Sequence, residues 1–139
     1  MRQLILSTPL LRAAFLGDAA ASAGMGVLLA AATHPLASLL ALPEPLLRGA
    51  GLVLLPYAVL VAWLGTRPTL PRWAVCGVIG VNLLWAADSL LLLALGWVSP
   101  NALGTAFVLV QAAAVLGFAA LQWAGLRRGA TDHATAVTA

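Results

Sequence analysis

Four long apolar segments, separated by short polar turns, follow one another along this chain of 139 residues. They cover about 10–32, 46–66, 73–95 and 101–126. Each contains the roughly 20 apolar residues that an α-helix needs to cross the hydrocarbon core of a bilayer. The pattern therefore predicts an all-α fold, an integral membrane bundle of four transmembrane helices joined by short turns.

The polar positions between the segments predict where helices start and stop. Thr8 and Ser99 are each followed by a proline, which predicts an N-cap residue and then proline at the first helical position. The apolar stretch 36–42 is too short to cross, so we expect a short interfacial helix after the first span. Residues 1–129 would then form the transmembrane domain, and 130–139 a flexible cytoplasmic tail.

Composition supports a membrane environment. Hydrophobic residues make up 63% of the chain and charged residues 8%, against about 45–50% and about 25% in soluble domains. So few charges could not cover a soluble fold of this size. For the first segment a cleavable signal peptide is an alternative, because Ala-Ser-Ala occurs at 21–23; however, Asp18 interrupts the hydrophobic region and the apolar run continues beyond that site.

The arginine distribution predicts the orientation. With four spans, both termini and the 67–72 turn lie on one side, together with Arg2, Arg12, Arg67, Arg72, Arg127 and Arg128, whereas Arg48 lies on the other. The positive-inside rule then places both termini in the cytoplasm of a multi-pass protein of the inner (plasma) membrane. The arginines are dispersed at segment ends, so nucleic acid is not a predicted partner.

A polar face interrupts the third span. Asn82, Trp85, Asp88 and Ser89 are spaced at i, i+3, i+6 and i+7, so they share one side of a helix. A carboxylate at mid-span costs about 2.5–3.5 kcal/mol on insertion scales. Such residues normally face the interior of a bundle.

Two partners are predicted for Asp88, which lies about 12 Å from the predicted end of its helix. The short turn makes the third and fourth spans antiparallel neighbours, so Gln111 lies at a similar depth. Arg48 is the one arginine that enters from the same side, which predicts an Asp88–Arg48 ion pair. Glu44 competes for Arg48 from one helical turn away.

A second polar site is predicted around Asp18 in the first span. Tyr57 of the second span lies at roughly the same depth, and Ser22 follows one helical turn after Asp18. The two hydroxyl groups can donate hydrogen bonds to the carboxylate. The polar residues of both sites are either interhelical hydrogen bonds worth about 0.6 kcal/mol each or stations on a proton or substrate path.

The sequence contains few residues that could form a catalytic or metal-binding site. The chain has a single cysteine, Cys76, and two histidines, His34 and His133, predicted to lie on opposite sides of the membrane. No nucleophile stands in a pattern with a base, and no metal-ligand spacing or nucleotide-binding loop occurs. We therefore predict no enzymatic activity, no cofactor and no metal.

Two functions remain open. The first is an accessory or scaffold protein, whose partners are the lipid bilayer and other membrane helices of itself or a larger complex. The second is a proton- or ion-coupled transporter acting as a homo-oligomer, with Asp88 and Asp18 as coupling sites and Trp85 lining the pocket. In layout the chain resembles the small multidrug-resistance transporters, which also have four short spans with an acidic residue, there glutamate, in the first. The resemblance covers topology alone.

Overall fold

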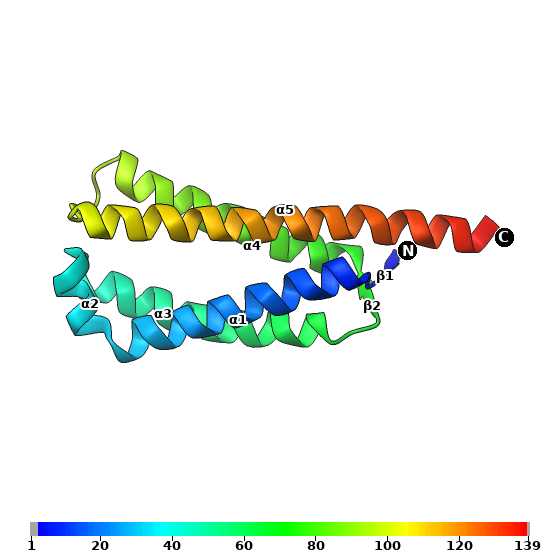
Figure 1. Cartoon of the computed structure of the whole chain (residues 1–139), viewed down its shortest axis with the longest axis horizontal. Coiled ribbons are helices and arrows are strands. Elements are labelled where there is room, and N and C mark those ends of the chain that lie inside the picture. The colour runs from blue at the N-terminus through cyan, green and yellow to red at the C-terminus, as the bar shows by residue number, and fades with distance from the viewer. Residues whose placement is uncertain (1–2, 139) are drawn as a thin grey trace.

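The structure of the protein is a computed structural model that describes residues 3–138; Arg2 and the side chain of His133 fall outside the described part. Helices make up most of it, and two short strands pair with each other (Figure 1). In chain order the elements are β1 Leu4–Leu6, α1 Pro9–Ala31, α2 Thr33–Leu40, α3 Glu44–Gly65, β2 Thr69–Pro71, α4 Arg72–Ala94 and α5 Ala102–Thr138.

The four predicted spans are present as α1, α3, α4 and α5, and each is long and apolar enough to cross a membrane. Thr8 caps α1 as expected, because its side-chain oxygen accepts the amide of Leu11 at 3.2 Å. The fourth helix is longer than predicted. We expected a flexible tail from residue 130, whereas α5 continues to Thr138. That segment is rich in alanine and contains no proline, so nothing in it ends the helix.

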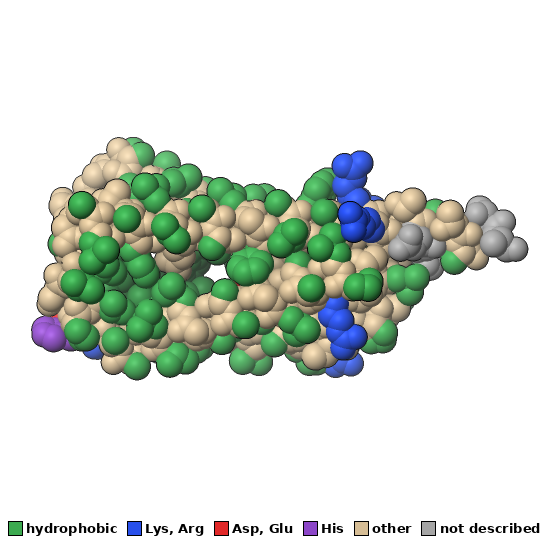
Figure 2. Space-filling view, viewed as in Figure 1, with side chains coloured by type: hydrophobic (Ala, Val, Ile, Leu, Met, Phe, Trp, Pro, Cys, Tyr) green, Lys and Arg blue, Asp and Glu red, His purple; other side chains and the backbone are tan. Residues whose placement is uncertain are grey.

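The long helices form two hairpins. Helix α1 packs against α3, α4 packs against α5, and contacts between α1 and α5 join the two pairs. Figure 1 shows the hairpins close together near the chain termini and further apart toward α2. Figure 2 shows that the surface is hollowed between the hairpins. The bundle therefore has a closed end near the termini and an open end near α2.

Glycines let the helix backbones approach closely within and between the hairpins. A Cβ atom on Gly51 of α3 would lie 2.8 Å from the amide nitrogen of Ala30 and 2.9 Å from the carbonyl oxygen of Gly26 on α1. A Cβ atom on Gly125 of α5 would lie 2.8 Å from the Cα atom of Leu11. Small residues allow such packing in membranes, where apolar burial does not drive helices together.

A strand pair closes the end near the termini. β1 pairs antiparallel with β2, with Ile5 opposite Leu70, and both side chains are buried in the core. Helix α5 covers the pair closely, since a Cβ atom on Gly129 would lie 2.6 Å from the carbonyl oxygen of Leu6. The sequence of 67–72 predicts a turn only, whereas residues 69–71 form β2. Strands of three residues are too short to produce a recognisable alternation.

The short helix predicted after the first span is α2, and Asn101 connects it to α5. The side-chain amide of Asn101 donates to the carbonyl of Leu39 at 2.8 Å, and its backbone amide donates to Leu40 at 3.3 Å. Its side-chain oxygen accepts the amide of Gly104 at 2.8 Å. Asn101, not Ser99, therefore caps α5; our prediction of Ser99 was wrong because it could not include the contact with α2.

The glycine contact between α1 and α3 can be tested with a pair of alanine substitutions two residues apart. Gly51→Ala should lower the stability by about 1–3 kcal/mol, because the methyl group meets backbone atoms of α1. Gly49→Ala should be neutral or slightly stabilising, because a Cβ atom there meets nothing within 4 Å and alanine favours a helix. Thermal unfolding by circular dichroism in one detergent measures both, and equal effects would contradict this packing.

Candidate functional site

The carboxylate of Asp18 is the centre of a hydrogen-bond network that reaches every long helix. The side chain is fully buried, nine residues after the start of α1, or about 14 Å along the helix. One carboxylate oxygen, Oδ1, accepts the hydroxyl of Ser22 at 3.2 Å. The other, Oδ2, accepts Tyr57 of α3 at 2.9 Å, Asn82 of α4 at 2.8 Å and Gln122 of α5 at 2.8 Å. We call these five residues the Asp18 network.

Burial makes this network important for folding. Asn82 and Gln122 are 2% and 0% exposed, and the amide of Asn82 also reaches the side-chain oxygen of Gln122 at 3.2 Å. A carboxylate offers about four acceptor positions, and four donors surround Asp18. The arrangement therefore satisfies a buried acid with donors from all four long helices.

The hydroxyl of Tyr57 gives the network two proton arrangements. Its oxygen lies 2.9 Å from Asp18 Oδ2 and also 2.9 Å from Asn82 Oδ1. A tyrosine has one hydroxyl proton, so it can donate to only one of these acceptors at a time. The hydroxyl therefore has two alternative acceptors, one on α1 and one on α4.

The structure brings Asp18, Ser22 and Tyr57 together at the predicted second site and adds two residues that sequence reasoning did not assign there. Asn82 could have been found by counting inward from the arginines, because both Tyr57 to Arg67 and Arg72 to Asn82 span ten residues. Both side chains therefore lie at a similar depth.

Gln122 could not be assigned to this site because the predicted span ended at residue 126, which put Gln122 one turn from the membrane edge. In the structure α5 continues to Thr138, and its contact with α1 at Gly125 brings Gln122 to the network. The relative register of α1 and α5 depends on tertiary packing between hairpins. No short turn connects these two helices, so the sequence contains no direct signal for their register.

Asp88 lies in a different environment. It is exposed and lines a cleft of about 540 Å³ between α3, α4 and α5, together with Trp85, Trp97 and Gln111. We call this the Asp88 cleft. Asp88 lies six residues before the end of α4 at Ala94, so it is about 9 Å from that end. Among the described side chains its carboxylate has no hydrogen-bond or ion-pair partner.

Both predicted contacts of Asp88 are therefore wrong. Arg48 forms no ion pair with it, because the two hairpins diverge and α3 does not pack along α4 at this end. Gln111 lines the same cleft but forms no hydrogen bond with Asp88. Glu44, the competing partner considered for Arg48, is paired instead with Nδ1 of His34.

The predicted polar face of α4 is divided between the two sites. Asn82 belongs to the Asp18 network, whereas Asp88 and Ser89 line the Asp88 cleft. Trp85 lines this cleft and also a small cavity that reaches Tyr57 and Asn82. The hydroxyl of Ser89 donates to the carbonyl of Trp85 at 2.8 Å. A continuous face on the helix thus contacts both the closed centre and the open part of the bundle.

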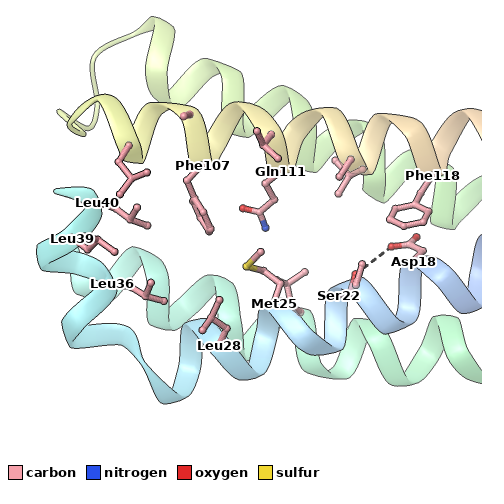
Figure 3. A pocket seen from close by; sticks show the side chains of 17 residues that line it. Asp18, Ser22, Met25, Leu28, Leu36, Leu39, Leu40, Phe107, Gln111 and Phe118 are labelled. Carbon is pink, nitrogen blue, oxygen red and sulfur yellow. Dashed lines mark hydrogen bonds between the residues drawn. The ribbon is translucent and has the colours of Figure 1, made fainter.

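A second cleft, which we call the α2 cleft, lies between α1, α2 and α5 and has a volume of about 560 Å³ (Figure 3). Asp18 and Phe118 lie at its inner end, and Leu36 and Leu39 of α2 lie at its outer end. Gln111 points into it from α5 and also lines the Asp88 cleft. The lining is almost entirely hydrocarbon, so this cleft suits an apolar chain or side chain.

Among the described residues, no three histidine, cysteine or acidic side chains gather in a way that could hold a metal ion. No protein-family model, curated protein or solved structure matches this chain.

The different environments of the two acids predict opposite effects of the same substitution. Asp18→Leu should strongly lower thermal stability, because Tyr57, Asn82 and Gln122 lose a common acceptor and each unsatisfied group costs about 1–3 kcal/mol. Asp18→Asn should be milder, since it keeps one oxygen for these donors. Asp88→Leu should leave stability unchanged or raise it, because it removes a carboxylate without a partner in the described chain.

Thermal unfolding of all three variants in the same detergent measures this difference. A larger loss of stability in Asp88→Leu than in Asp18→Leu would show that the roles are assigned to the wrong acids.

Proposed function

We propose that this chain is a small multi-pass membrane protein without catalytic machinery, an accessory or scaffold component that packs against other membrane helices. The observation that carries the proposal is Asp88: it is an exposed carboxylate within a helix long and apolar enough to span a membrane, and no described residue pairs with it. An intramembrane acid normally pairs with another polar group or lines an aqueous path. A helix of a second chain could provide that group.

The shape of the bundle supports the same proposal. Most of the apolar residues of α3, α4 and α5 that border the Asp88 cleft are exposed or half-buried, and Leu47 is the exception. The cleft lies where the two hairpins diverge. A partner helix in this cleft would bury Trp97, which is 69% exposed, and could donate a hydrogen bond to Asp88. The Asp18 network connects the four long helices within this one chain. The chain can therefore fold without a partner helix in the Asp88 cleft.

We further propose an inner (plasma) membrane location with both termini in the cytoplasm. Arg12, Arg67, Arg72, Arg127 and Arg128 are exposed near the end that contains the strand pair (Figure 2). Arg48 lies near the opposite end, at the start of α3. This bias supports the orientation given by the positive-inside rule.

A photo-crosslinking amino acid at Ser89, which lines the cleft, tests the assembly in native membranes. Position 84 serves as the matched control, because Leu84 is exposed on the same helix and lines none of the described cavities. We expect a discrete crosslink to another membrane protein or a second copy at position 89 and little at position 84. Asp88→Leu should abolish it, whereas Asp88→Asn, which can still form hydrogen bonds, should retain part of it.

Equal crosslinking at the two positions, or an Asp88→Leu variant that crosslinks like wild type, would count against a partner helix in the cleft. The stability of Asp88→Leu, measured separately, distinguishes loss of the partner from loss of the fold.

A second candidate function is transport of a lipophilic cation by a homo-oligomer. The specific observation is that Trp85, Trp97, Phe107 and Asp88 line the same cleft, and aromatic faces and a carboxylate are the groups that bind organic cations. In this case tetraphenylphosphonium should quench tryptophan fluorescence saturably in wild type and not in Asp88→Asn. Lack of saturable quenching in wild type would exclude this candidate for that class of cation.

A further inference from the structure

A third cavity, separate from both clefts, lies at the closed end of the bundle. It has a volume of about 400 Å³ between the start of α4 and the C-terminal half of α5. Arg72 enters it from α4, and Arg127 and Arg128 enter it from α5. Trp123 and Leu126 form its apolar side. We call it the arginine pocket.

The three guanidinium groups of this pocket carry charge that the described side chains do not neutralise. Among the described side chains there is one ion pair, between His34 and Glu44, and both residues lie at the opposite end of the bundle. By contrast, Arg67 on the same end stacks over Trp63, 4.2 Å from the ring centroid, and does not line the pocket. Like charges are thus held around one cavity. Their mutual repulsion favours an anion between them.

Guanidinium groups bind phosphate through paired N–H donors, and three of them present donors from two different helices. The start of α4 adds to this attraction, because Arg72 is its first residue and the positive end of a helix dipole favours negative charge. The apolar side, in contrast, does not suit a fully hydrated anion. Trp123 is 50% exposed at a level where an aromatic ring would meet the headgroup region of a bilayer.

We propose that the arginine pocket binds the phosphate headgroup of an anionic phospholipid, with the acyl chains along the apolar surface of α4 and α5 beside Trp123. This site lies beyond the proposed partner cleft and does not depend on it, because the pocket and the Asp88 cleft share no lining residue. A free phosphate would use the same guanidinium groups but not the apolar side. The lipid is therefore the ligand that uses both parts of the pocket.

The test compares two double variants with the same change in charge. Arg127→Gln/Arg128→Gln removes two pocket arginines, and Arg12→Gln/Arg67→Gln removes two exposed arginines of the same end that do not line the pocket. Native mass spectrometry of the full chain, titrated with phosphatidylglycerol or phosphatidylcholine, gives the affinity for each lipid. Wild type should prefer phosphatidylglycerol.

Loss of the two pocket charges should weaken phosphatidylglycerol binding by about thirty-fold, as expected when two arginines near a phosphate are removed. The control pair should weaken binding by no more than about threefold, because more distant charges are screened. The single variant Arg127→Gln should give an intermediate loss, which keeps the test informative if the double variant does not fold.

Three results would overturn the proposal. Equal losses in the two double variants would mean that the lipid responds to the overall surface charge. Equal affinity of wild type for the two lipids would mean that the headgroup charge is not recognised. Inorganic phosphate would be identified as the ligand by either of two observations. It could displace phosphatidylglycerol, or it could raise the unfolding temperature in lipid-free detergent by as much as phosphatidylglycerol does.

Discussion

The arrangement of the four long helices depends on the hydrogen bonds that the buried carboxylate of Asp18 accepts. In a bilayer, apolar surface does not drive helices together, because the lipid is as apolar as the side chains. A buried acid with donors from α3, α4 and α5 provides the missing directionality, since each helix must present one polar side chain at the same point. Leucine-rich surfaces alone would allow many rotations of each helix, and the hydrogen bonds to Asp18 select one of them.

The same constraint explains why the bundle is closed at one end and open at the other. The strand pair of β1 and β2, the contact of Gly125 with Leu11 and the Asp18 network all lie toward the termini. Toward α2, a hydrogen bond from Asn101 connects α5 to α2. In the same half of the molecule, α3 and α4 do not pack along each other. The two large clefts lie in that half of the molecule. Closure and opening therefore result from where the contacts between the two hairpins are placed along the helices.

The limits of the first three long helices could be predicted from the sequence because bilayer thickness determines the length of an apolar segment. The Asp18–Tyr57 contact followed for a similar reason: both residues could be placed by depth. What could not be predicted depends on contacts between hairpins. Gln122 was not assigned because the register of α5 on α1 leaves no periodic signal, and β1 was not predicted because three residues are too few for one. The Asp88–Arg48 pair failed because lying on the same side of the membrane does not make two helices neighbours.

The two acids within the long apolar helices show how environment, more than residue type, decides what a carboxylate does. Asp18 and Asp88 were both predicted to face the interior of the bundle. Placing either carboxylate in hydrocarbon costs free energy for the same reason, because the group loses its hydration. Asp18 is surrounded by four donors from its own chain, so its hydrogen-bonding capacity is used within the fold. Asp88 has no such donors among the described residues and opens on a cleft with two tryptophans. Because no described side chain uses its hydrogen-bonding capacity, Asp88 can accept hydrogen bonds from a group that enters the cleft. This is why we propose that function should be sought first at Asp88, and not at the more deeply buried Asp18.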